Sequence, residues 1–388
     1  MDKVYADRTL RAAWVRVKRN RGAAGVDRQS IAAFDEQAER YLGDLATGLR
    51  TGTYRPQPIR RVWIEKRGKK EQRPLGIATV KDRIVQTALK LVLEPIFEAG
   101  FAEQSYGFRP GRNCKDALRR VDTLLKSGAV WVVDADIQHY FDAIPRERMM
   151  NEVERKVADG RVLDLIEAYL SQGVMEGTEV WKPEAGTPQG AVMSPLLANI
   201  YLDPLDHSMA RRGTEMVRYA DDFVLMCGSR EEAEAALTAL QTWVEGSGLE
   251  LHPEKTRIVD ARERGGFDFL GYHFERGMRW PKPGSTKQFR RAIGAKTSRS
   301  RGDSLGTIIT SVNPIIRGWY EYYKHGKVNT FDTMDGYVRG RLRSILRKRA
   351  GGRGRGRGAD HQKWNNAFFD EHGLFTMKAA RDAAGYSR

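Results

Sequence analysis

The chain has 388 residues, enough for two or three domains, and 40% of them are hydrophobic, as in globular proteins. Sixty-six Lys and Arg residues against 50 Asp and Glu give a formal charge of +16, which favours a polyanionic partner. Two widely separated cysteines exclude a disulfide framework and a Cys-based zinc module, and no apolar run approaches the roughly 20 residues that span a bilayer. Because the first residues also lack the apolar stretch of a signal peptide, we expect a cytoplasmic protein that binds nucleic acid and no membrane.

The first 130 residues combine helices with a cation-rich hairpin. Residues 1–50 show helical periodicity interrupted by a Gly-Ala loop at 21–27, which is either a plain interhelical loop or a loop that packs on a ligand. From residue 54 the pattern changes to strands, and their cations include Lys66 and Arg73. Such a hairpin suits a phosphate-rich ligand, although lysines also protect solvated edge strands. Residues 82–99 then form an amphipathic core helix.

The loop at 105–112, Ser-Tyr-Gly-Phe-Arg-Pro-Gly-Arg, combines aromatic rings, glycines and the cations Arg109 and Arg112. A loop of this composition can stack bases and hold phosphates at once, and so we predict a nucleic-acid contact. Gly-Pro loops with arginine are common, so this loop alone is only suggestive.

A buried strand at 130–136 ends in Asp136, and backbone carbonyls such as that of Ile137 converge there. This is a suitable place to bind a metal ion. Asp134 and Asp142 are rivals by composition. We expect Asp134 to point to the opposite side of the strand's end or into solvent, and Asp142 to cap the next helix.

A single helix is predicted at 149–170, followed by the loop Gly-Thr-Pro-Gln-Gly at 186–190 and a helix at 195–207. We interpret Gln189 and Gly190 as letting the sugar and base of a nucleotide approach the backbone closely, with an ordinary helix entry as the alternative.

The stretch 216–226 reads as a hairpin with Asp221 and Asp222 at its tip, after Tyr219. Adjacent like charges need a cation, and a hard divalent ion with oxygen ligands is the natural one. An isolated turn with two aspartates is usually only solvated, and therefore the other motifs decide between these readings.

A helix at 230–247, a strand at 249–259 with Lys255 near its turn, and a hairpin at 267–274 follow. The order strand, helix, hairpin, helix, strand predicts an α+β fold with a ferredoxin-like (RRM-like) antiparallel sheet covered by helices on one face. That topology brings Asp136 beside the hairpin at 221–222.

Beyond residue 280, long basic helices are predicted at 307–325 and 331–349. The first contains Arg317, Trp319 and Tyr320, which are either helix core with snorkelling cations or an RNA-binding surface. A Gly-Arg linker at 351–358 and a small segment that can dock but not fold alone complete the chain.

Asp136, Asp221 and Asp222 on two adjacent strands would bind two Mg²⁺ ions and act as the catalytic residues of an in-line phosphoryl transfer. Lys66 and Arg73 are predicted to clamp the triphosphate. Phe141 lies where its ring could exclude a ribose 2′-hydroxyl and select dNTPs.

This ordered series resembles the reverse transcriptases encoded by bacterial group II introns, also called maturases. The matching segments are 20–27, Arg-Pro-Leu-Gly-Ile at 73–77 with 82–83, 105–109, Asp136 with Phe141, Pro-Gln-Gly at 188–190, Tyr-Ala-Asp-Asp at 219–222, Leu-Gly-Tyr at 270–272 and the aromatic helix at 317–323. The resemblance covers roughly residues 15 to 375.

The resemblance implies a right-hand polymerase with a helical fingers extension and a helical thumb. The expected domains are an N-terminal extension (1–50), fingers (51–130), palm (131–278), thumb or maturase domain X (279–350), and a basic linker with a small DNA-binding segment (351–388). The implied reaction is RNA-templated DNA synthesis from dNTPs on a template–primer duplex, and the implied RNA partner is a group II intron or another structured RNA. Tyr219, Leu270 and Gly271 would contact nucleic acid, and Lys255 the dNTP.

Two departures from the family pattern stand out. No Cys/His endonuclease domain follows the thumb, so an existing DNA end is the expected primer, and Ala78 replaces a usual proline. Two other functions stay open: a non-catalytic RNA-binding splicing cofactor, and a domesticated reverse transcriptase that works in repair or phage defence.

Overall fold

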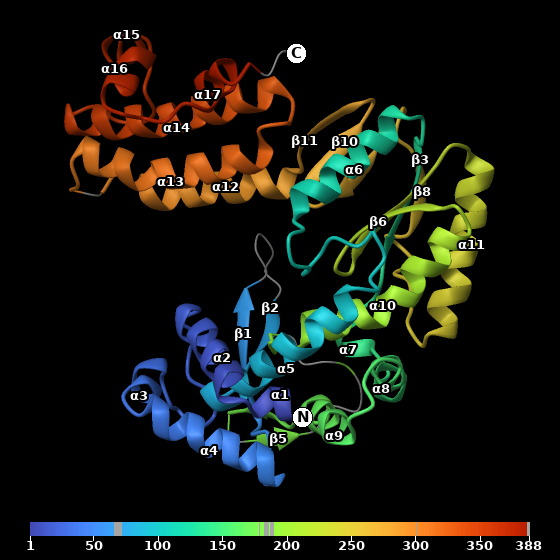
Figure 1. Ribbon diagram of the computed structural model, residues 1–388. Coiled ribbons are helices and arrows are strands. Elements are labelled where there is room, and N and C mark those ends of the chain that lie inside the picture. The colour runs from blue at the N-terminus through green and yellow to red at the C-terminus, as the bar shows by residue number, and fades with distance from the viewer. Residues whose placement is uncertain (66–71, 178, 182–185, 187–189, 301, 386–388) are drawn as a thin grey trace. The chain divides into compact units, whose positions relative to one another are not determined.

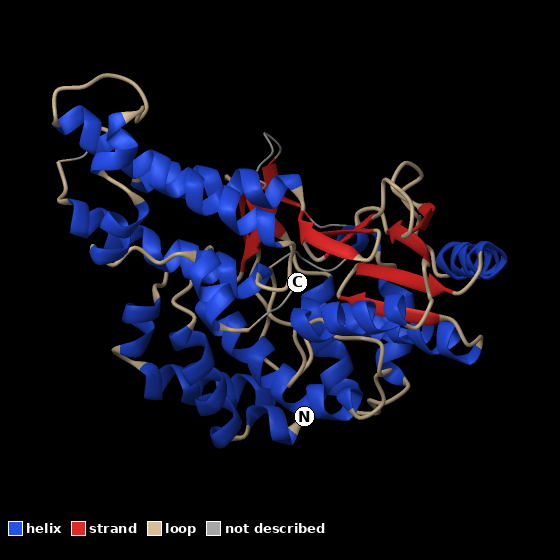
Figure 2. Cartoon of the chain, turned by 90° about the horizontal axis from the view of Figure 1, so that it is seen from above, coloured by secondary structure: helices blue, strands red, loops and turns tan. Residues whose placement is uncertain are grey.

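A computed structural model describes the chain except for residues 66–71, 178, 182–185, 187–189, 301 and 386–388 (Figure 1). The described chain divides into two compact units, Met1–Val259 and Asp260–Arg388. Each unit combines helices with antiparallel strand pairs, which confirms the α+β class. Figure 2 shows the helices and strands of the chain in different colours. The finer division into five domains remains a prediction.

The sheet that carries the aspartates belongs to the first unit and has the strand order β6-β7-β3-β8. Its strands are β3 (Trp131–Asp136), β6 (Glu215–Tyr219), β7 (Asp222–Cys227) and β8 (Arg257–Asp260). This order is the one predicted from the split βαβ arrangement, because the hairpin β6–β7 pairs through β7 with β3. The strand predicted at 249–259 is mostly absent: β8 begins only at Arg257, and Leu251 forms an isolated bridge with Ile137.

Helices α10 (Ser194–Arg211) and α11 (Arg230–Gly246) cover one face of this sheet. Val133 and Ala135 of β3 and Phe223 and Leu225 of β7 are buried in the same hydrophobic core as these helices. Since successive strand residues point to opposite faces, the even-numbered residues of both strands lie on the other face of the sheet. That face carries Asp134, Asp136 and Asp222.

A second sheet of the first unit has the order β2-β1-β4-β5, and it contains the predicted basic hairpin. Strands β1 (Ile59–Glu65) and β2 (Gln72–Ile77) pair antiparallel, with their turn outside the described residues. Strand β4 (Val174–Glu176) pairs parallel with β1 and antiparallel with β5 (Glu179–Trp181). The first unit also contains the helices α1 (Asp2–Tyr5), α2 (Asp7–Arg19), α3 (Ile31–Asp35), α4 (Ala38–Thr51), α5 (Val80–Glu98) and α6 (Cys114–Lys126), of which α6 contacts β6 of the first sheet.

The single helix predicted at 149–170 is wrong. The chain forms α7 (Tyr140–Ala143), α8 (Arg146–Glu154) and α9 (Gly160–Leu170). The break has a capping cause: the side chain of Asp159 accepts hydrogen bonds from the N–H groups of Arg161 and Val162, so a new helix begins there.

The second unit consists of a three-stranded antiparallel sheet followed by helices. Its strands are β9 (Phe267–Phe269), β10 (Tyr272–Glu275) and β11 (Met278–Pro281), and its long helices are α12 (Pro283–Lys296), α13 (Leu305–Tyr323) and α14 (Val328–Arg349). Three short helices, α15 (Ala359–Lys363), α16 (Asn366–Glu371) and α17 (Met377–Ala383), make up the C-terminal segment.

The C-terminal segment docks on the long helices, as predicted. The carboxylate of Asp335 in α14 accepts hydrogen bonds from the N–H groups of Met377 and Lys378, at 3.1 and 3.0 Å, and Arg343 donates to the carbonyl of Trp364 at 2.7 Å. Within the described ranges, no helix combines the length and apolarity needed to cross a lipid bilayer.

Candidate active site

Asp136 and Asp222 stand directly opposite each other on neighbouring strands, β3 and β7. Opposed residues of an antiparallel pair have Cα atoms about 4.5–5.5 Å apart, and their side chains share one face of the sheet. Asp221 lies next to this pair, in the two-residue turn that joins β6 to β7. The predicted meeting of position 136 with the hairpin at 221–222 is therefore confirmed.

Lys255 pairs with this cluster from a third segment. Its ammonium forms an ion pair with the carboxylate of Asp136, and the two side chains are 56% and 41% exposed. Two backbone hydrogen bonds align residues 250–252 with the end of β3: His252 N–H to the Asp136 carbonyl at 2.7 Å, and Gln138 N–H to the Glu250 carbonyl at 2.9 Å. The residue predicted to contact the dNTP thus lies within reach of the aspartates.

The expectations that Asp134 points to the opposite side and that Asp142 caps the next helix are wrong, whereas the solvent-facing alternative for Asp134 fits a side chain that is 22% exposed. Asp134 lies on the same face as Asp136, because residues two apart in a strand share a face, and it forms an ion pair with Arg257 at 3.3 Å. Asp142 caps no helix: it is the third residue of α7, whose N-cap position is occupied by His139.

The described residues contain no group of three or more His, Cys, Asp or Glu side chains close enough together to hold a metal ion. Two features nevertheless fit a divalent cation: the donors are carboxylate oxygens, and a positive charge already neutralises Asp136. A metal ion on Asp136 would have to replace or share the contact with Lys255. Ile137, predicted to add a backbone oxygen, follows β3 directly and is buried.

The predicted nucleotide-binding residues lie on three elements of the first unit. Phe141 is in α7, half-buried, with its ring 5.4 Å from that of Tyr140. Gly190 has φ +100° and lies against β2, because a Cβ there would stand 2.8 Å from the carbonyl oxygen of Gly76. Arg73 lies in β2, opposite Ile64. Lys66 and Gln189 lie outside the described residues.

The loop at 105–112 differs from its prediction, because its arginines are used within the protein. Arg109 is 7% exposed and donates to the Glu98 carboxylate and to two backbone carbonyls, so the structure does not support a nucleic-acid contact for it. Arg112 is paired with Glu103. The exposed aromatic ring of this loop is that of Phe108, which is 46% exposed and lies 6.3 Å from the ring of Tyr219.

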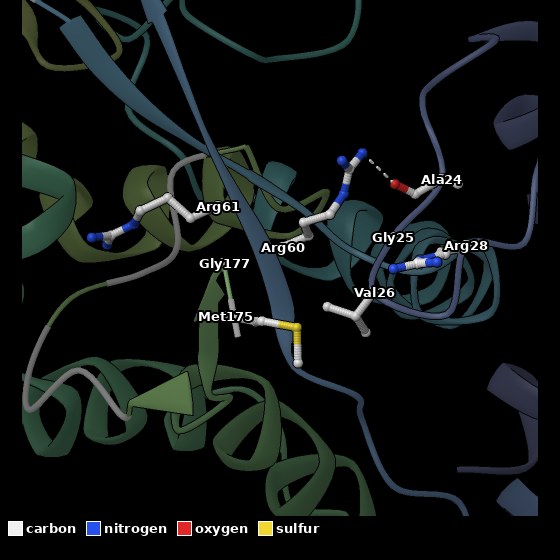
Figure 3. A pocket seen from close by; sticks show the side chains of 8 residues that line it. All are labelled: Ala24, Gly25, Val26, Arg28, Arg60, Arg61, Met175 and Gly177. Carbon is white, nitrogen blue, oxygen red and sulfur yellow. Dashed lines mark hydrogen bonds between the residues drawn. The ribbon is translucent and has the colours of Figure 1, made fainter. Parts of the chain in front are cut away.

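Sequence reasoning missed a basic cavity of about 500 Å³ between the loop at 24–28 and the second sheet (Figure 3). Arg28 and Arg60 line it, and the Arg60 guanidinium donates to the carbonyl of Ala24 at 2.7 Å. Arg61, the next residue of β1, also lines the cavity, and its side chain extends to the other side of the strand from that of Arg60. The glycine-alanine loop was the only sequence signal for this cavity. Arg28 and Arg60 did not stand out, because other basic residues lie near both of them in the sequence.

In the second unit, the Leu270–Gly271 turn joins β9 to β10 and is held by α13. The Tyr322 hydroxyl donates to the Leu270 carbonyl at 2.7 Å. Of the three residues predicted to bind RNA on α13, Arg317 is exposed and lies 4.3 Å over the Phe375 ring. Trp319 packs on Phe289 at 5.0 Å. Tyr320 is only 4% exposed, so it is a core residue and the predicted contact is not supported.

Comparison with known proteins gives two family matches. Residues 64–274 match the family described as reverse transcriptase (RNA-dependent DNA polymerase), and residues 286–364 match the group II intron, maturase-specific domain. The first match covers more than half of the chain.

Two relatives illustrate the similarity. The group II intron-encoded protein LtrA of Lactococcus lactis subsp. cremoris is 39% identical over 48% of this chain and 31% of its own length. Protein YkfC of Escherichia coli (strain K12) is 33% identical over 65% of this chain and 76% of its own length. The chain thus spans about a third of LtrA but three quarters of YkfC.

Among solved structures, a telomerase from Candida albicans has a TM-score of 0.50 at 11% identity, covering 92% of this chain and 71% of that chain. This likeness shows the fold alone.

Proposed function

Because the chain belongs to the reverse transcriptase family, we propose that it is an RNA-directed DNA polymerase of group II intron type, which adds dNTPs to a primer 3′-hydroxyl on an RNA template. The observation that carries this proposal is the register of Asp136 with Asp222, with Asp221 in the adjoining turn. An antiparallel sheet that places carboxylates from two sequence-distant segments on one face offers the donors that phosphoryl transfer requires.

The family uses a divalent metal ion for catalysis, and we propose two Mg²⁺ ions here. Asp136, Asp221 and Asp222 would hold them, together with the backbone of Ile137. When bound, the metal ions activate the attacking hydroxyl and stabilise the leaving oxygens. Lys255 has its own part: its ammonium neutralises Asp136 before metal and nucleotide arrive, and turns to the triphosphate afterwards.

We propose further nucleotide contacts from other segments of the first unit. Lys66 and Arg73 of the β1–β2 hairpin bind the phosphates, and Gln189 and Gly190 lie against the sugar and base. Phe141 excludes the 2′-hydroxyl. The support for this group is the close approach of Gly190 to Gly76 of β2.

Nucleic-acid binding is proposed for both units. The formal charge of +16 supports it, as does the exposed Phe108 beside Tyr219. The maturase-specific match in the second unit supports binding of intron RNA to assist splicing and mobility, with Arg317, Leu270 and Gly271 as contacts. We propose that the protein works in a cytoplasmic ribonucleoprotein and that residues 351–388 contact DNA.

A second candidate is a non-catalytic RNA-binding splicing cofactor. It is favoured by one observation: no three-carboxylate metal group is present among the described residues. A domesticated reverse transcriptase that acts in repair or phage defence would share the chemistry of the first candidate and differ only in its partner.

The test is primer extension on poly(rA)/oligo(dT) with Mg²⁺. The double variant Asp221→Ala/Asp222→Ala should lose dNTP incorporation and keep its RNA affinity. The matched control is Asp134→Asn, which changes a carboxylate on the same face that pairs with Arg257, and it should keep its activity. Undiminished synthesis by the double variant would refute the site, and a wild-type chain without synthesis would favour the splicing cofactor.

A further inference from the structure

A buried fork of hydrogen bonds lies beneath the turn that carries Asp221. Arg218, the penultimate residue of β6, is 0% exposed. Its Nε donates to Asp206 Oδ1 at 2.8 Å, and its Nη2 pairs with the other oxygen of that carboxylate. Its Nη1 donates to Asn199 Oδ1 and to the Ala220 carbonyl oxygen, both at 2.9 Å. One guanidinium therefore connects α10 to the peptide that precedes Asp221.

The loop at 104–107 holds the same turn from a second direction. It runs beside β6, with hydrogen bonds from Arg218 N–H to the Gln104 carbonyl at 2.9 Å and from Tyr106 N–H to the Arg218 carbonyl at 2.8 Å. Asn199 Nδ2 donates to the Gly107 carbonyl at 2.8 Å. Asn199 thus links the loop to the Arg218 fork.

Gly107 permits this approach because it has no side chain. A Cβ at position 107 would stand 2.2 Å from the Ala220 backbone nitrogen, closer than two such atoms can approach. Ala220 itself has φ +61°, a conformation that residues other than glycine adopt only when their surroundings enforce it. The hydrogen bonds of Arg218 and the packing of the loop at 104–107 hold Ala220 in this conformation.

The chemistry of the fork requires arginine. Its planar guanidinium reaches a carboxylate, an amide oxygen and a backbone carbonyl at once, whereas a lysine ammonium has no such fixed geometry. Burying this charge is tolerable only because Asp206, also 0% exposed, accompanies it. The Arg218–Asp206 ion pair therefore fixes the position of the guanidinium. The hydrogen bonds from this guanidinium to Asn199 and to the Ala220 carbonyl then fix the position of the turn.

We infer that Arg218 and Asn199 are positioning residues, which fix the Ala220–Asp221 peptide and thereby aim Asp221 and Asp222 at the face that carries Asp136. The loop at 104–107 then supports the aspartate hairpin from its other side. The consequence for catalysis rests on the proposed function, whereas the fixing of the turn does not.

The test uses Asn199→Ala and Gly107→Ala in the full chain. Asn199→Ala cuts the link between loop and fork and leaves the Arg218–Asp206 pair intact. Gly107→Ala pushes directly on Ala220. The matched control is Gly43→Ala, the same chemical change at a helical glycine with nothing within 4 Å of the added Cβ.

Two readouts separate positioning from general destabilisation. Hydrogen exchange of the peptide across 216–223 should become faster in both variants and not in the control. In primer extension, kcat should fall by about tenfold to hundredfold, the range for small misplacements of catalytic groups, while KM for dNTP stays within about twofold of wild type. The Mg²⁺ concentration for half-maximal activity should rise with the fall in kcat.

The outcomes are distinct. Exchange and kcat equal to wild type in either folded variant would overturn the inference, and so would a rise in KM without a change in kcat. If one variant shows no cooperative unfolding transition, the other decides alone. If the wild-type chain itself incorporates no dNTP, the proposed function fails, and the exchange comparison alone decides whether the turn is held as inferred.

Discussion

Replacing Lys255 with methionine tests whether the cation on Asp136 is exchangeable. The ammonium pairs with the Asp136 carboxylate, and both side chains are about half exposed. Methionine keeps the length of the side chain and removes the charge. If Lys255 binds the nucleotide, the variant should change stability, metal requirement and nucleotide affinity in different directions. If the ion pair is only structural, all three should become worse together.

The expected magnitudes follow from the exposure of the pair. An exposed ion pair contributes about 0.2–1 kcal/mol to stability, so Tm should fall by no more than roughly 2–4 °C. Removing a competing positive charge near 4 Å in a largely aqueous setting is worth about 1 kcal/mol to a bound cation, or roughly fivefold in affinity. Losing a charge-assisted hydrogen bond to the triphosphate costs about 1.5–3 kcal/mol, which is roughly tenfold to hundredfold in kcat/KM for dNTP.

The assays are thermal unfolding with and without Mg²⁺, and primer extension at varied dNTP and Mg²⁺. The Mg²⁺ concentration for half-maximal thermal stabilisation should fall while KM for dNTP rises, so the two effects have opposite signs. The control is Arg257→Met, which removes a similarly exposed partner from Asp134 and should change neither. A loss of more than about 5 °C in Tm for Lys255→Met, beyond the range of an exposed pair, would refute the reasoning.

Phe141→Ala should raise ribonucleotide incorporation relative to dNTP incorporation on the order of tenfold, measured by competition in primer extension. An unchanged ratio of ribonucleotide to dNTP incorporation would show that Phe141 does not exclude the 2′-hydroxyl. RNA affinity should fall by on the order of a thousandfold between 50 and 200 mM salt if six or more phosphates are neutralised, and filter binding that shows a flat dependence would contradict it. Burial raises the pKa of Asp82, so the folded chain keeps this proton where the unfolded chain has lost it. Stability should therefore decline as pH rises from about 4 through the raised pKa. Asp82→Asn should flatten that part of the curve in urea titrations between pH 4 and 7, and an unchanged slope would exclude Asp82 as its source.

The backbone around the aspartates was predictable from the sequence. Alternating apolar residues on both sides of Asp221–Asp222 define a hairpin, and the order of elements in a split βαβ sheet places β7 beside β3. Register followed because one face of each strand must be buried, and a slip by one residue would expose Ala135 and Phe223. The family motifs fixed which carboxylates to expect there.

Side-chain partners were less predictable, because they come from distant segments. Arg109 looks like a phosphate contact in the sequence, but Glu98 and two carbonyls occupy its donors. Tyr320 belongs to an aromatic, basic helix and looks like an RNA contact in the sequence. The 3.6-residue periodicity of that helix places its side chain in the core. Asp159 begins α9 as its N-cap, after α8 has ended at Glu154, and the apolar periodicity across 149–170 concealed this capping signal.

Two cation–carboxylate pairs in the first unit differ in a way that assigns them different tasks. The Arg218–Asp206 pair is fully buried, and breaking it would leave an uncompensated charge in the core, at a cost of about 3–5 kcal/mol. The Lys255–Asp136 pair is half exposed and is open to screening and to competing ions. The buried pair thus fixes the hairpin in every state of the protein, whereas the exposed pair can be exchanged when substrate binds. Salt should consequently weaken the hold of Lys255 on Asp136 while leaving hydrogen exchange across the Ala220–Asp221 turn unchanged. Faster hydrogen exchange at higher salt would mean that the position of the turn depends on charges that salt can screen, and not on the buried Arg218–Asp206 pair.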